Sequence, residues 1–199
     1  MIPTSSKLSN NYPYIQLASG SPRRQQLLTE FGVHFKVISH RVDETLFLPE
    51  TFNSPQHYVK TLATEKAKQS DFSPNHWVLA ADTIVVLDNR VLEKPLSVQE
   101  ALQMLTALQG RSHTVFTGYC LFLPYKHTMY RRCCKTRVSF GKIDQDHLKA
   151  YIDTYQPFDK AGSYGLQELP DYFNYSISGS RHNVIGLPIR DILRLIKHI

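Results

Sequence analysis

The chain has 199 residues, of which 42% are hydrophobic and 20% charged, and its 23 Lys and Arg residues against 17 Asp and Glu give a net charge of +6. This length suits one globular domain with a substantial core, and the composition is too apolar and too aromatic for a disordered chain. Since no stretch approaches the roughly 20 consecutive apolar residues of a membrane helix and residues 1–13 lack the apolar segment of a signal peptide, we expect a cytoplasmic protein with a disordered extension over 1–13 and a single domain over 14–199.

The first half of the chain alternates strands and helices. The predicted elements, in chain order, are a strand over 14–18, a helix over 22–31, a strand over 35–38, a helix over 54–69 and a strand over 77–87. Ser21 and Pro22 are typical of a helix start, with Ser21 as the cap, and Gly32 is typical of a helix end. The run WVLAADTIVVL, at 77–87, is apolar nearly throughout, which indicates a strand buried on both faces.

The second half continues the mixture. The predicted elements are a strand over 90–92, a helix over 97–108, strands over 114–123 and 129–140 joined as a hairpin, a helix over 145–155, a strand near 172–178 and a final helix over 188–198. Ser97 and Asp144 stand at the positions of helix caps. The sequence therefore predicts an α/β fold with a mixed sheet.

The positive charge is concentrated between residues 126 and 142, a stretch without acidic residues. Its basic residues are Lys126, Arg131, Arg132, Lys135, Arg137 and Lys142. Such a strip either binds a phosphate backbone or solvates one face of a sheet, and the strand-like pattern without an aromatic recognition motif favours the second interpretation.

The cysteines predict no structural site. Cys120, Cys133 and Cys134 lack CxxC spacing, so we expect neither a disulfide framework nor a structural zinc ion, and we infer a reducing compartment. The nine histidines are scattered without a ligand spacing such as HExxH, and we interpret them as surface residues or satisfied core residues.

The segment SGSPRR, at 19–24, joins a predicted strand to a predicted helix. Free N–H groups at a helix N-terminus and two arginines favour an anion at such a place. The segment is neither a Walker A loop nor a GxGxxG motif. It is equally compatible with an ordinary helix start that carries solvated arginines.

Asp82 interrupts the apolar run at 77–87. An ionised carboxylate there is costly unless it is paired or binds a metal, although backbone donors could also satisfy it. Further acids and lysines stand near predicted element ends: Asp43, Glu44, Glu65, Lys66, Glu93 and Lys94. Carboxylates mixed with cationic side chains fit a magnesium–polyphosphate site better than the paired carboxylates of a glycosidase.

The segment DKAGSYGLQE, at 159–168, contains two glycines that would let its backbone approach a ligand closely. A plain turn is the simpler interpretation of this segment taken alone.

Six segments together resemble one family. LASGSPRRQQLL, DET, ATEKA, AADTIVVLDNRVLEKP, DKAGSYGLQE and NVIGLP occur in an order and at spacings that resemble the Maf family of nucleoside triphosphate pyrophosphatases, from about Tyr14 to the C-terminus. The resemblance implies a Maf/ITPase-like α/β fold with two lobes flanking a nucleotide cleft. It also implies hydrolysis of a nucleoside triphosphate to a monophosphate and pyrophosphate with a divalent cation, Mg²⁺ or Mn²⁺. The segment at 159–168 resembles the branch that acts on dTTP and UTP rather than the branch that prefers 7-methyl-GTP.

The resemblance implies roles for individual residues. Asp82 matches the proposed general base, and substrate choice is tied to Arg23, Thr83 and Gln167. Nucleotide or phosphate binding is expected of Ser19, Ser21, Arg24, Lys66, Lys94 and Lys160, and metal binding of Glu44, Asp82 and Glu93. An amide at Gln167 could pair with the donor and acceptor on the edge of uracil or thymine.

Two departures from the family pattern bear on base preference rather than on reaction type. Glu168 stands where many relatives have glycine, and residues 169–182 differ from the glycine-rich pattern of the pyrimidine branch. The alternatives are a Maf-type enzyme for modified nucleotides and a non-enzymatic regulator of cell division. A homodimer is implied by the family alone, and we expect neither a nucleic acid nor a membrane as partner.

Overall fold

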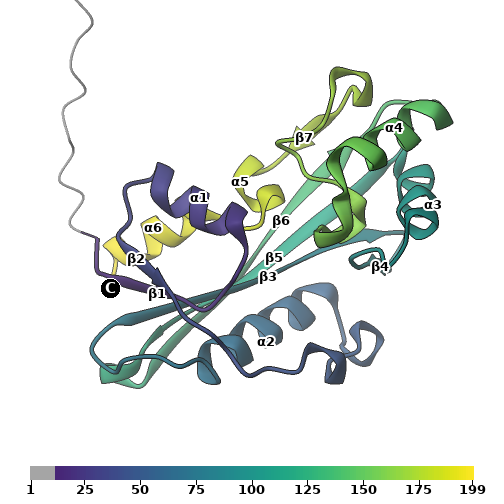
Figure 1. The fold of residues 1–199 in the computed structure, drawn as a ribbon. Coiled ribbons are helices and arrows are strands. Elements are labelled where there is room, and N and C mark those ends of the chain that lie inside the picture. The colour runs from purple at the N-terminus through teal and green to yellow at the C-terminus, as the bar shows by residue number, and fades with distance from the viewer. Residues whose placement is uncertain (1–11) are drawn as a thin grey trace, which may run out of the picture.

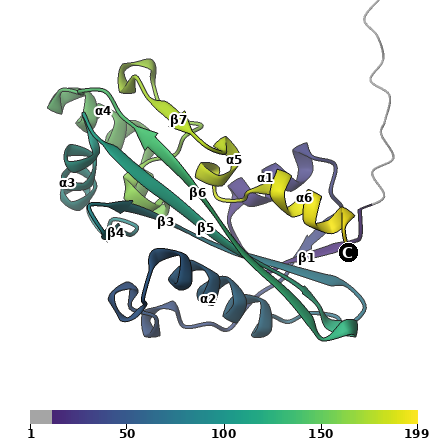
Figure 2. The same cartoon turned by 180° about the vertical axis from the view of Figure 1, so that it is seen from behind.

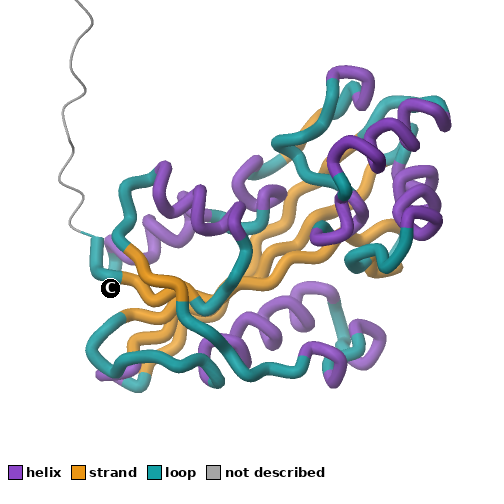
Figure 3. The backbone as a smooth tube through the Cα atoms, viewed as in Figure 1, coloured by secondary structure: helices purple, strands orange, loops and turns teal. Residues whose placement is uncertain are grey.

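The computed structural model describes residues 12–199, which form one seven-stranded sheet with helices on both faces (Figures 1 and 3). The strand order is β2-β1-β3-β5-β6-β7, with β4 paired to β3. β1 runs parallel to β2 and β3, and the other pairs are antiparallel. The predicted α/β class with a mixed sheet is confirmed. Most of the extension expected over 1–13 lies outside the described residues, and Tyr12 packs against the core.

The strands are β1 (Ile15–Leu17), β2 (Phe35–Val37), β3 (Trp77–Leu87), β4 (Arg90–Leu92), β5 (Ser112–Leu123), β6 (Thr128–Ser139) and β7 (Ser176–Ser178). The helices are α1 (Pro22–Glu30), α2 (Pro55–Lys68), α3 (Val98–Leu108), α4 (Gln145–Tyr155), α5 (Arg181–Ile185) and α6 (Ile189–Lys197). The structure differs from the sequence predictions in three respects. The sequence analysis did not predict α5, and β7 starts later than expected because 171–173 form a 3-10 turn. The hydroxyl of Ser21 does not make the expected capping bond to α1.

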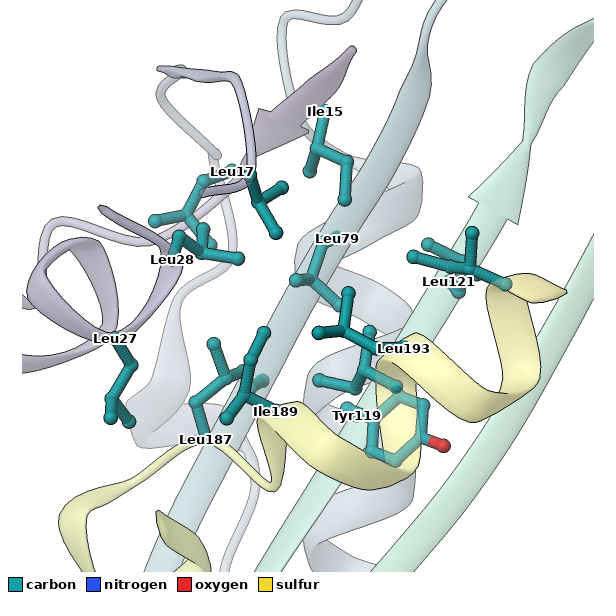
Figure 4. Packing of buried hydrophobic residues seen from close by; sticks show 14 of the residues in the cluster. Ile15, Leu17, Leu27, Leu28, Leu79, Tyr119, Leu121, Leu187, Ile189 and Leu193 are labelled. Carbon is teal, nitrogen blue, oxygen red and sulfur yellow. The ribbon is translucent and has the colours of Figure 1, made fainter. Parts of the chain in front are cut away.

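The apolar residues of β3 enter four clusters, two on each face of the sheet: Leu79 with Ala81, Val85 with Leu87, Val78 with Ala80, and Ile84 with Val86. The first cluster packs under α1 and α6, as Figure 4 shows, and the second packs under α3 and α4. α2 covers the opposite face (Figure 2). Asp82 and Thr83 stand where the clusters of each face meet, so the polar residues of the strand mark the boundary between two halves of the core.

The surface carries the predicted basic strip. All six of its side chains are exposed on or beside β6, as expected of solvated strand residues.

The three cysteines are free thiols, and Cys120 is buried. Within the described residues, no helix combines the length and the apolar composition needed to cross a membrane.

α2 lies unusually close to β5 because Gly118 has no side chain. A Cβ atom at Gly118 would lie 2.4 Å from the carbonyl carbon and oxygen of Val59 in the middle of α2. Those atoms belong to helix backbone, so a side chain there could be accommodated only if the helix moved.

Gly118→Ala should therefore destabilise the protein by about 1–3 kcal/mol, or more if α2 cannot shift. The measurement is urea unfolding at equilibrium. Gly20→Ala is the matched control, since nothing lies within 4 Å of a Cβ at Gly20. Equal stability of the two variants would contradict the close approach of α2.

Candidate active site

The cleft forms where one edge of β3 is left unpaired. β1 pairs with residues 77–79 and β4 with residues 85–87, whereas β5 follows the other edge over 78–86. Residues 80–84 are thus open on one side, and residues 82–84 of this stretch line a cleft of about 630 Å³. The gap between two strand ends brings Asp82 and Thr83 to this cleft.

Every predicted site residue except one lines this cleft. The lining includes Ser19, Ser21, Arg23, Arg24, Glu44, Lys66, Asp82, Thr83, Glu93, Lys94 and Lys160. Gln167 lies outside the lining, contrary to expectation: its side chain is exposed and donates a hydrogen bond to Gln26 Oε1 at 3.4 Å. Gln167 is kept out of the cleft by the direction of the preceding residue. The Leu166 side chain is buried in the core, and the Gln167 side chain points away from the core into solvent.

Lys66 occupies the centre of the acidic end of the cleft. It comes from the buried face of α2, and its Nζ atom lies 2.8 Å from Asp82 Oδ1 and 2.9 Å from Glu44 Oε2. The Lys66 side chain is only 6% exposed. Burial alone would raise the pKa of Glu44, but the charges of Lys66, Lys94 and His40 outweigh burial and lower the pKa.

Arg24 ties together three segments that are distant in the chain. Its guanidinium donates hydrogen bonds to Gly186 O at 2.8 Å, to Ser19 Oγ at 2.8 Å and to Thr83 Oγ1 at 3.1 Å. Burial lowers the pKa of Arg24, and the Asp82 carboxylate opposes that shift. Since these donors are bound within the protein, Arg24 fixes the loop before α1 against β3.

Arg23 reaches across to the segment that follows α4. Its two terminal nitrogens donate to the carboxylate of Asp159 at 2.6 Å and to the Asp159 carbonyl at 3.2 Å. Asp159 Oδ1 also lies 2.8 Å from Lys160 Nζ. Burial would raise the pKa of Asp159, but Lys160 and Arg23 together lower it.

The cleft also has an apolar lining. Its side chains belong to both halves of the core: Val85, Val115, Tyr164, Leu166, Val184 and Ile185. Tyr164 is held in place by a 2.7 Å hydrogen bond between its hydroxyl and Nε2 of the buried His113. The cleft therefore combines charged side chains with apolar ones.

His40 and Tyr58 are among the cleft residues that sequence reasoning missed. The prediction that the histidines are surface or satisfied core residues is wrong for His40, because it lines the cleft and its buried Nδ1 has no hydrogen-bond partner among the described residues. Burial and the Lys66 charge lower the pKa of His40. Burial, and then the charges of Asp82, Glu93 and Glu44, raise the pKa of Tyr58. Of these two, Tyr58 had a sequence signal, because its spacing from Leu62 and Ala63 puts the three side chains on one face of the helix predicted over 54–69.

Comparison with known proteins identifies the family of this chain. The family model for Maf-like proteins matches residues 14–199. A dTTP/UTP pyrophosphatase of Bacillus cereus (strain ATCC 10987 / NRS 248) is 40% identical over 193 residues, which cover 96% of this chain and 92% of the relative. The dTTP/UTP pyrophosphatases of Bacillus cereus (strain AH187) and Bacillus anthracis are each 40% identical over 185 residues, 92% of this chain and 94% of each relative. The chain belongs to the Maf family.

Proposed function

We propose that this protein hydrolyses nucleoside triphosphates, dTTP and UTP above all, to the monophosphate and pyrophosphate. The observation that carries this proposal is the pairing of Lys66 with Asp82 and Glu44 at the acidic end of a cleft that also has an apolar lining. A nucleoside triphosphate has the same combination, since a planar base is joined to a highly charged tail. The relatives named as dTTP/UTP pyrophosphatases support the choice of substrate.

The phosphate tail would lie beside Lys66, at the acidic end of the cleft. Lys94 also lines the cleft and makes no ion pair with any described residue, so it is available to an anion. The start of α1 adds backbone N–H groups, because no side chain caps this helix and no acidic residue stands in its first turn. Arg23 and Lys160 would hold or orient the nucleotide from the opposite side.

Asp82 would orient and deprotonate the attacking water. Its Oδ1 atom accepts a hydrogen bond from Lys66, and no described residue donates to Oδ2. The carboxylate is thus held in one orientation with one oxygen directed to other partners, which is the arrangement that a general base requires.

The carboxylates at this end fit a divalent cation that arrives with the triphosphate. Among the described residues, no three His, Cys, Asp or Glu side chains are arranged to hold a metal ion by themselves. Mg²⁺ is commonly bound by one or two carboxylates together with substrate phosphates, and Asp82, Glu44 and Glu93 can supply that part. When bound, the ion would neutralise charge on the departing pyrophosphate.

The nucleobase would lie against the apolar lining, between Tyr164 and Ile185. We propose that Arg23 and Thr83 contribute to base choice from the edge of this region. A role for Gln167 requires its side chain to leave Gln26 and turn toward the cleft.

The free thiols are consistent with our proposal of a cytoplasmic location, since disulfides are rare there.

Asp82→Asn should reduce kcat about 10²- to 10⁴-fold, because the amide keeps the shape of the side chain but is not a base. Pyrophosphate release from UTP is the measurement, with circular dichroism to verify the fold. Asp71→Asn is the matched control, since Asp71 also pairs with a cationic side chain, that of Arg41, but lies on the surface. Near-wild-type turnover by a folded Asp82→Asn variant would exclude Asp82 as the base.

Removal of divalent cations should abolish turnover, and Mg²⁺ or Mn²⁺ should restore it. The assay compares EDTA with EDTA already saturated with magnesium, so that only the free chelator differs. Turnover that persists after exhaustive chelation would remove the cation from the proposed reaction.

The value of kcat/KM should be highest for dTTP and UTP, by roughly 10-fold or more over CTP and 7-methyl-GTP, because one mismatched buried hydrogen bond costs about 1–3 kcal/mol. Rates of pyrophosphate release across these four nucleotides measure the preference. A ranking led by 7-methyl-GTP would assign the protein to the other branch of the family.

A further inference from the structure

Lys160 is shared between two carboxylates. Its Nζ atom lies 2.8 Å from Asp159 Oδ1 and 3.1 Å from Glu168 Oε2, and its side chain is 7% exposed. Asp159 is bound in turn by Arg23 from α1. The four side chains form a chain of alternating charge, with Arg23 at one end and Glu168 at the other.

Glu168 acts on the cleft only through Lys160. Its carboxylate is not part of the cleft lining, and no hydrogen-bond donor within residues 12–199 serves its buried Oε2 atom, so the ammonium is its compensating partner. Gly165 makes this contact possible, because a Cβ there would lie 2.8 Å from Lys160 Cε and 3.0 Å from Glu168 Oε2. The Lys160 stem and the Glu168 carboxylate are thus packed on bare backbone.

The electrostatic consequence concerns the triphosphate. Arg23 and Lys160 balance Asp159 and Glu168, so the four side chains are neutral together and the charge of the Lys160 ammonium is already compensated within the protein. The ammonium must also leave a carboxylate before it can approach a phosphate oxygen. Lys94, by contrast, has no such competitor among the described residues.

We propose that Glu168 is a positioning residue that restrains Lys160 in the cleft wall and thereby weakens binding of the phosphate tail, without altering the chemical step. This inference rests on the proposed function for the identity of the ligand. It assigns a specific effect to a residue that stands where the family pattern commonly has glycine.

Glu168→Gln tests the inference, because it removes the charge and keeps the length of the side chain. We expect KM for both UTP and dTTP to fall about 3- to 10-fold, with kcat within about 2-fold of wild type. Glu50→Gln is the matched control, because Glu50 is exposed and lies outside the cleft lining. Its KM should stay unchanged. Glu168→Ser, which also removes the charge, replaces Glu168→Gln if that variant fails to fold.

The Lys160→Met background shows whether the effect passes through the ammonium. In that background, Glu168→Gln should no longer lower KM. An unchanged or raised KM for the single variant would overturn the inference, and so would an equal fall in KM with Lys160 already removed.

Equilibrium binding separates this inference from the proposed function. We compare two calorimetric titrations with UTP and magnesium, one of the Asp82→Asn variant and one of the Asp82→Asn/Glu168→Gln double variant. The double variant should bind UTP about 3- to 10-fold more tightly than the single variant. Absence of hydrolysis by the wild-type protein would refute the proposed function while the titration still reports on Glu168. Equal affinities in the titration would refute the inference whether or not hydrolysis occurs.

Discussion

The position of the Lys66 ammonium between Asp82 and Glu44 constrains much of the remaining structure. A buried ammonium is unfavourable without compensating charge, and loss of one partner from a buried ion pair commonly costs about 3–5 kcal/mol. The partners come from the middle of β3 and from the 3-10 turn η1 (Glu44–Leu46). α2 must therefore pack on the sheet at the level of Asp82, and Gly118 permits the close approach that this requires.

Much of the fold could be predicted because its signals are local. The apolar run of β3 and the capping side chains of Ser97 and Asp144 depend only on neighbouring residues, and the structure places them as expected. α5 could not be predicted because five residues are too few to show a helical period. Its position depends instead on tertiary contacts such as the bond from Thr117 Oγ1 to Asn183 O.

For the candidate site, the sequence predicted which residues line the cleft better than it predicted how their side chains are paired. Family motifs identified the residues that line the cleft, but they carried no information about which side chains are paired within the protein. Arg24 is an example, since a sequence cannot show that its donors bind Gly186, Ser19 and Thr83. The partners of Lys66 and Lys160 also depend on contacts between distant segments. These paired charges organise the cleft before any ligand arrives, which is the arrangement that favours electrostatic catalysis.

The long hairpin of β5 and β6 has a mechanical consequence. Its register is continuous from Ser112 opposite Ser139 to Leu123 opposite Thr128, and Figure 2 shows it running through both halves of the molecule. A hinge within this sheet would have to break a ladder of backbone hydrogen bonds, so the halves behave as one rigid frame. Adaptation to ligands is left to the loops and side chains around the rim. A lineage built on such a frame can diversify its rim by mutation while the unfolding free energy, which resides in the frame, stays nearly constant.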